Sequence, residues 1–134
     1  MQSRVKWVEG MTFLAQSNSG HSVVMDGNGG EKAPSPMELV LMAAGGCSSV
    51  DVVSGLQSAN QKITGCEAQI SSVRRETAPR IFTTANLHFV VTGHDLDDAL
   101  VAKMVADSLE KYCSVCLMLG EGVELTHSYE VVVA

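Results

Sequence analysis

The chain is poor in aromatic residues and in positive charge, and it has no long hydrophobic segment. One Trp, two Tyr and three Phe leave a core that has to be filled by aliphatic side chains and Met. Nine Lys and Arg stand against fifteen Asp and Glu without forming a basic cluster, which argues against nucleic acid and membranes as partners. The longest uncharged apolar run, residues 39–50, has 12 residues and is too short to cross a bilayer.

The amino-terminal residues 1–7 lack the apolar core of a secretory signal peptide, so we expect a cytoplasmic protein. Thiols stay reduced in that compartment, and the four Cys are then catalytic, metal-binding or simply buried rather than paired in structural disulfides. The length of 134 residues and the apolar fraction of 46% are typical of one globular domain, residues 1–134.

Sequence patterns predict six β-strands and three helices. The first three strands are expected to form an antiparallel meander and the next two a hairpin. We expect strands at 4–9, 12–16, 21–26, 66–76, 80–92 and 123–133, and helices at 35–58, from Asp95 to a break at 111–112, and from Cys113 to Gly120. This order, βββ-α-ββ-α-α-β with hairpin links, favours an α+β fold over a parallel doubly wound sheet.

The first helix has a strong start signal. Ser35 can cap it, Pro36 suits the first helical position, and Glu38 completes a capping box. The helix is apolar nearly all round, so we expect it to be central and covered on most sides. Gly45 and Gly46 cost about 1 kcal/mol each relative to Ala inside a helix, which indicates the close approach of another helix, a second subunit or a substrate.

Several common catalytic and binding signatures are missing. The glycine-rich loop 27–34 has neither a following Gly-Lys-Ser/Thr nor a G-x-G-x-x-G pattern, so a connector is the better interpretation than a phosphate cradle. There is no G-x-S-x-G nucleophile motif. Cys113 and Cys116 form a C-x-x-C without a second ligand pair, because the other candidate ligands are scattered, and we expect neither a metal nor a cofactor. Those scattered residues are Cys66, His21, His88, His94 and His127.

Two cysteines, 66 positions apart, carry the remaining chemistry. Cys47 lies in the middle of the first helix, where a thiolate needs a cation from elsewhere in the fold, and where a buried core thiol is the alternative. Cys113 is expected at the amino end of the third helix, next to Lys111, and both features favour its thiolate. The residues alone therefore make Cys113 the more activated thiol.

Two segments resemble the motifs of a known family. Residues 30–39, Gly-Glu-Lys-Ala-Pro-Ser-Pro-Met-Glu-Leu, and 43–47, Ala-Ala-Gly-Gly-Cys, look like the central-helix motif of the osmotically inducible protein C/organic hydroperoxide resistance (OsmC/Ohr) superfamily. Residues 110–115, Glu-Lys-Tyr-Cys-Ser-Val, look like its second-cysteine motif. The order of elements also matches over nearly the whole chain, and the details are most similar to the YhfA-type branch.

The resemblance implies an intertwined homodimer, in which antiparallel sheets wrap around paired central helices and the active sites lie at the subunit interface. It implies a thiol-dependent hydroperoxide reductase that works without metal or flavin. Cys47 would attack an organic hydroperoxide and become a sulfenic acid, and Cys113 would condense with it to a disulfide. A dithiol such as a lipoylated protein would reduce that disulfide. Cys116, Glu38 and Lys111 are auxiliary candidates.

The chain departs from the peroxidase pattern at two places. The glutamate that follows the helix-start proline in the peroxidases is Met37 here, and Glu38 is rotated by about 100° around the helix. The family arginine would fall near Gly27, which leaves Lys32, Arg4 or Arg80 as substitutes. These departures keep open an alternative function, in which the protein binds a hydrophobic small molecule or senses redox state at the dimer interface without turnover.

Overall fold

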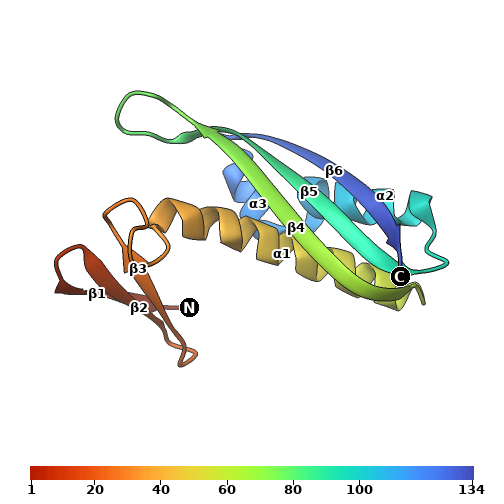
Figure 1. The fold of residues 1–134 in the computed structure, drawn as a ribbon, viewed down its shortest axis with the longest axis horizontal. Helices are drawn as coiled ribbons and strands as arrows, with labels where there is room; N and C mark the ends of the chain where they lie inside the picture. Colours follow the sequence, from red (N-terminus) through yellow and green to blue (C-terminus); the bar gives the residue numbers. More distant parts are fainter. The chain divides into compact units, whose positions relative to one another are not determined.

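The computed structural model describes residues 1–134, which form two compact units, 1–42 and 43–134. Helix α1 (Pro36–Ser58) begins in the first unit and continues into the second (Figure 1). It is long and apolar enough to cross a membrane by length and composition, a test that the core helix of a soluble protein also passes. The α+β class is confirmed, with two three-stranded sheets.

The first unit contains the predicted meander. Strands β1 (Ser3–Glu9), β2 (Thr12–Ser17) and β3 (Ser22–Asp26) pair antiparallel in the order β1-β2-β3. The register places apolar side chains of all three strands on one face, since side chains alternate between faces along a strand. These are Val5, Trp7, Phe13, Ala15, Val23 and Met25.

Polar and apolar residues alternate at 4–9, a pattern that predicts a half-buried strand, and this expectation is wrong for the single chain. All seven residues of β1 are exposed, and Trp7 keeps 67% of its surface accessible. On the apolar face of this sheet Val5, Trp7 and Val23 are exposed, while Phe13, Ala15 and Met25 are partly buried.

The loop after β3 is organised by the buried carboxylate of Asp26. The backbone N–H groups of Asn28 and Lys32 each donate to one of its oxygens, at 2.6 Å. The bond from Asn28, followed by that from Lys32, holds the pKa of Asp26 below its usual value. Because these loop N–H groups serve a carboxylate of the chain itself, the connector interpretation of residues 27–34 is supported over a phosphate cradle.

The predicted capping box starts α1. The Glu38 N–H donates to Ser35 Oγ at 3.2 Å, and the Ser35 N–H donates back to Glu38 Oε1 at 2.9 Å. These two bonds lower the pKa of Glu38, with the backbone bond as the larger cause. Glu38 is therefore fully explained as a structural residue of the first unit.

The second unit contains strands β4 (Lys62–Arg74), β5 (Phe82–His94) and β6 (Glu124–Val133) in the order β4-β5-β6. The β4–β5 hairpin is antiparallel as predicted, but β6 runs parallel to β5, so this sheet is mixed. Three helical segments between β5 and β6 return the chain to the starting end of β5: α2 (Asp98–Asp107), a π-helical turn, η1 (Ser108–Tyr112), and α3 (Ser114–Leu119). Such a long crossover permits parallel pairing.

The predicted starts of α2 and β4 are wrong. The cap of α2 is Asp97, whose side chain accepts the Leu100 N–H at 3.3 Å, whereas Asp95 adopts a left-handed turn with φ of 51°. Strand β4 begins at Lys62, which places Cys66 inside the strand rather than at its start.

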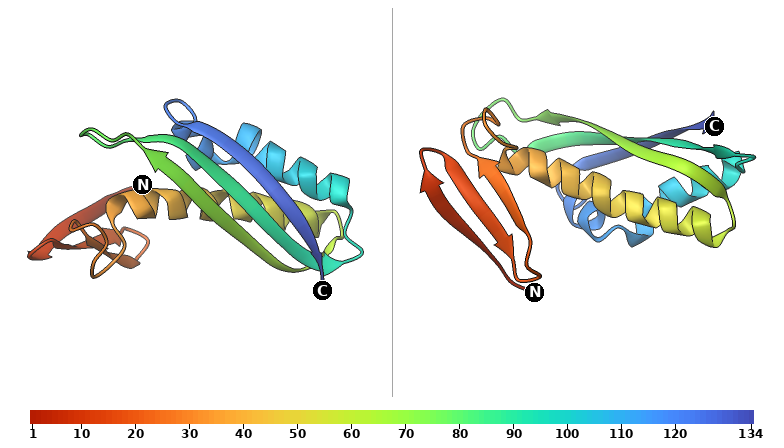
Figure 2. Two further views of the ribbon diagram at one scale, coloured as in Figure 1. Left: turned by 45° about the horizontal axis from the view of Figure 1, so that its top comes forward. Right: turned by 60° about the horizontal axis from the view of Figure 1, so that its bottom comes forward.

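The helices of the second unit lie on one face of its sheet (Figures 1 and 2). Within this unit α1 buries only one stripe, Ala44, Gly45, Ser48, Val52 and Leu56, against the sheet and the later helices. The opposite side is open, with Val50 at 66% exposure, so the expectation of a helix covered on most sides is wrong for the single chain.

The role of Asp26 gives a test of how the first unit is held together. Its depressed pKa means that its stabilising effect is present above the ordinary pKa of 3.8 and is lost as the pH falls through the lower folded value. We expect Asp26→Asn to be less stable than wild type at pH 7, with a smaller loss of stability on going from about pH 5 to about pH 2. Urea denaturation across this range measures both effects. Glu31→Gln, in the same loop, is the control and should keep the wild-type pH profile.

Candidate functional site

Cys47 and Cys113, the predicted catalytic residues, both lie where α1 faces the segment that contains η1 and the start of α3. Ser108 Oγ, in η1, lies 2.8 Å from Asp51 Oδ2 and 3.2 Å from the backbone oxygen of Ser48, both on α1. Farther along, Cys116 Sγ lies 3.9 Å from the backbone oxygen of Ala44. Cys47 lies between these two contacts on the same helix and packs against the core that includes Cys113 and Cys116.

Cys113 is fully buried and caps α3. It receives the Cys116 N–H on its sulfur at 3.3 Å, so the predicted start of the third helix is confirmed. The thiols of Cys47 and Cys116 lie close enough to its sulfur to raise its pKa, and Cys47 packs against the core cluster that contains both of the other thiols. The fold therefore brings together the two cysteines that are 66 positions apart, with Cys113 in the middle of a group of three thiols.

The expectation that Cys113 is activated is wrong. Burial is the main cause of a rise in the pKa of its thiol to about 12; the N–H of Cys116 offsets part of this rise, and the neighbouring thiols add to it. Lys111 does not stabilise a Cys113 thiolate, because its ammonium group pairs with Asp107, with Nζ 3.5 Å from Oδ1. The desolvation cost of a buried thiolate outweighs the attraction of a short helix end.

Cys116 is almost fully buried, at 1% exposure. Burial is the main cause that raises the pKa of its thiol, and the charges of Cys47 and Asp51 add to the increase, while its contact with Cys113 lowers it. Asp51, one turn after Cys47 on α1, brings a carboxyl group to this region rather than the cation that a thiolate requires.

Cys47 is the least enclosed of the three thiols, being half-buried. Its two glycine neighbours differ in their surroundings. A Cβ on Gly45 would come within 2.6 Å of Ile70 Cδ1, whereas a Cβ on Gly46 would meet nothing within 4 Å. Gly45 thus allows α1 to approach β4 closely, while Gly46 lies on the open side of the helix.

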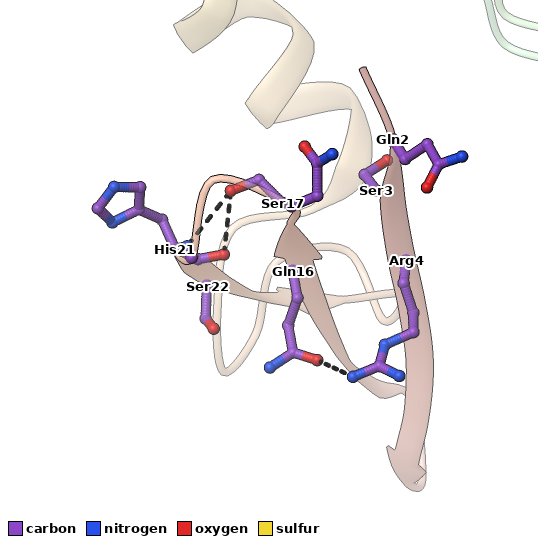
Figure 3. Close-up of a pocket in the computed structure, with 9 residues that line it drawn as sticks. Gln2, Ser3, Arg4, Gln16, Ser17, His21 and Ser22 are labelled. Atoms are coloured by element: carbon purple, nitrogen blue, oxygen red, sulfur yellow. Dashed lines mark hydrogen bonds between the residues drawn. The ribbon is translucent and has the colours of Figure 1, made fainter.

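Arg80 and Arg4, two of the residues expected to substitute for the family arginine, each bond to other groups. Arg80 Nε donates to the backbone oxygen of Arg75 at 3.0 Å, in the β4–β5 turn. Arg4, in the first unit, donates from Nη2 to Gln16 Oε1 at 2.9 Å, at the side of a polar pocket of about 340 Å³ (Figure 3). In this pocket the N–H of His21 donates to Ser17 Oγ at 3.3 Å, so its polar groups largely serve one another.

The remaining candidate ligands stay apart. His88 lies 2.8 Å from Ser128 Oγ, and His127 lies 3.5 Å from Glu110 Oε1, on neighbouring strand and helix surfaces. No group of three His, Cys, Asp or Glu side chains is placed to hold a metal ion. Cys66 has a pKa raised by burial.

Sequence reasoning did not find the hydrogen bonds that fasten η1 to α1. Ser108 is fully buried, and the Cys113 N–H donates to its backbone oxygen at 2.7 Å across the π-helical turn. Asp51 was the available signal, because it is the one acidic residue in the middle of an apolar helix and lies one turn after Cys47. Its partner could not be read from the sequence.

The comparisons with known proteins agree with this fold. A family model described as OsmC-like protein matches residues 29–128. The chain belongs to the OsmC-like family. It is 66% identical to Protein YhfA of Escherichia coli K12 over 134 residues, which is 100% of both chains.

Solved structures show the same OsmC-like fold. A structural genomics structure with 64% identity covers 100% of both chains with a TM-score of 0.96. The organic hydroperoxide resistance protein OhrB of Bacillus subtilis, with 18% identity, superposes with a TM-score of 0.63 over 97% of this chain and 98% of that one. The OsmC-like fold predicted from the two cysteine motifs is confirmed.

The three thiols should differ in reactivity in the folded protein. With a pKa of about 12, Cys113 is ionised in roughly one molecule in 10⁴ at pH 8, and it is fully buried. We expect iodoacetamide to label Cys47 first and to leave Cys113 and Cys116 nearly unlabelled on the same timescale. Mass spectrometry of digests measures the rates, and labelling in urea, where all sites should react alike, is the control. Labelling of native Cys113 as fast as Cys47 would contradict the burial argument.

Proposed function

We propose that this protein is a thiol-dependent reductase of organic hydroperoxides, with a role in oxidative-stress defence. The observation that carries the proposal is the contact between Cys47 and Cys113 in the core of the second unit. Membership of the OsmC-like family and the likeness to a protein named for organic hydroperoxide resistance support a redox role. The site uses side chains of the protein alone.

The difference in burial assigns the roles of the two thiols. Cys47, half-buried, attacks the hydroperoxide, which leaves as an alcohol while the sulfur becomes a sulfenic acid. Cys113 then attacks that sulfur, and its thiol proton leaves with the hydroxyl group as water. A thiol whose pKa is raised to about 12 suits this second role, because it keeps its proton until the sulfenic acid forms next to it. A dithiol reductant, such as a lipoylated protein, restores both thiols.

Intact-mass measurement after one equivalent of cumene hydroperoxide tests this chemistry. We expect the wild-type chain to lose two hydrogens, and Cys47→Ser to stay unchanged. The double variant Cys113→Ser/Cys116→Ser should gain one oxygen, because the sulfenic acid has no thiol neighbour. Cys66→Ser is the matched control and should behave like wild type. An unchanged wild-type mass would overturn the peroxidase proposal and favour ligand binding without turnover.

We further propose that the protein acts as a homodimer in the cytoplasm. The apolar face of the β1-β2-β3 sheet and the open side of α1 are both uncovered in the single chain, which is unusual for a stable monomer. The side of α1 forms a shallow hollow of about 380 Å³, lined by Gly46, Ser49, Val50, Val53, Ser54 and Gln57. A second copy, as the family resemblance implies, would cover both surfaces, and Gly46 would let its backbone come close.

A charge on the open side of α1 should separate the subunits. We expect Val50→Glu to shift the mass in light scattering from dimer to monomer, because the carboxylate would be buried at the interface without a partner. Val133→Glu, at a still more exposed valine near the carboxyl end, is the control and should leave the dimer intact. A wild-type protein that scatters as a monomer would rule out the dimer.

A further inference from the structure

The two-thiol cycle leaves the third buried thiol without a role. Cys116 is nearly as buried as Cys113, contacts its sulfur, and lies over α1 at Ala44, one turn before Cys47. Cys113 is thus in contact with two thiols, Cys47 from one helix and Cys116 from its own. A sulfur that has a neighbour on each side can exchange one disulfide partner for the other.

The local geometry permits a bond between Cys113 and Cys116. Cys113 is the cap of α3 and Cys116 is three residues later, a spacing at which Cα atoms of a helix are about 5 Å apart. Disulfides require Cα separations of about 4.4–6.8 Å. The Cys113 sulfur already points at the backbone N–H of Cys116, at 3.3 Å.

We propose that Cys116 takes over the disulfide from Cys47, an inference that rests on the proposed function. The Cys116 sulfur attacks the Cys113 sulfur of the Cys47–Cys113 disulfide, the bond to Cys47 breaks, and the electron pair leaves with Cys47. The proton of the Cys116 thiol goes to the Cys47 thiolate or to water. The exchange needs no further oxidant or reductant, since one disulfide is converted into another.

The exchange separates the hydroperoxide site from the site of reduction. Cys116 lines a surface groove of about 430 Å³, whose walls combine apolar side chains with carboxylates: Leu109, Leu117, Val123 and Leu125 with Glu110, Glu121 and Glu124. A disulfide at Cys113–Cys116 therefore has Cys116, although only 1% exposed, in the wall of a groove that is open to solvent, which is the side from which a dithiol reductant would approach. Cys47, half-buried on α1, can then react with a second hydroperoxide before the Cys113–Cys116 disulfide has been reduced.

A tryptic digest distinguishes the Cys47–Cys113 disulfide from the Cys113–Cys116 disulfide. It cuts after Lys32, Lys62 and Lys111, so Cys47 lies in peptide 33–62, while Cys113 and Cys116 share peptide 112–134. After one equivalent of cumene hydroperoxide and alkylation at increasing times, we expect the crosslinked peptides first. The wild-type crosslink should then give way to peptide 112–134 lighter by two hydrogens, with Cys47 alkylated. In Cys116→Ser the crosslink should persist.

Stoichiometry gives a second readout. Without reductant, wild type should consume two equivalents of cumene hydroperoxide per chain, the second at the freed Cys47, whereas Cys116→Ser should consume one. Cys66→Ser should match wild type. A crosslink that persists in wild type, with Cys116 alkylated and one equivalent consumed, would overturn the exchange and leave the proposed function standing.

Oxidation by diamide tests the exchange without any hydroperoxide. We expect the disulfide in wild type to settle within peptide 112–134. If diamide first gives the crosslink to peptide 33–62 and then this product, while cumene hydroperoxide oxidises nothing, the exchange stands and the peroxidase function fails. If diamide yields only the crosslink to peptide 33–62, the exchange is overturned whatever the hydroperoxide does.

Discussion

The close packing of α1 in the second unit is the constraint on which the candidate site depends. The stripe that includes Ala44, Ser48 and Leu56 is buried against the sheet and the helices that follow β5. Gly45 permits this, because any larger residue would meet Ile70 of β4. Once the stripe is buried, the rotation of the helix is set, and Cys47 comes to lie at the border between the buried stripe and the open side.

Burial then decides the chemistry of the thiols more than local charge does. A π-helical turn, bonded through Ser108 to α1, places Cys113 at the start of α3 with its sulfur inside the core. The cost of an unsolvated thiolate keeps this thiol protonated, while Cys47 has access to water. Unequal burial suits a two-step reaction, in which the more exposed thiol attacks the substrate and the buried thiol then forms the disulfide.

Much of the fold was predictable because its signals are local. The capping box of Ser35 and Glu38 and the meander of β1 to β3 depend on residues a few positions apart, and both formed as predicted. The errors in the cap of α2 and in the direction of β6 arose where the structure depends on more than the local sequence pattern. Asp97 rather than Asp95 caps α2, since Asp95 is used in a left-handed turn, and β6 pairs parallel to β5 because a long helical crossover returns the chain.

The sequence by itself determined the residue types, the helix start and the family, because motifs carry these directly. It placed Cys47 within α1 and Cys113 at the start of α3, and it named the thiols as the reactive groups. Only the tertiary structure decided that these thiols meet, that Cys116 joins them, and that Cys113 is protonated rather than activated. The physical reason is that desolvation depends on every element packed around a group, and those neighbours come from parts of the chain that no local pattern connects.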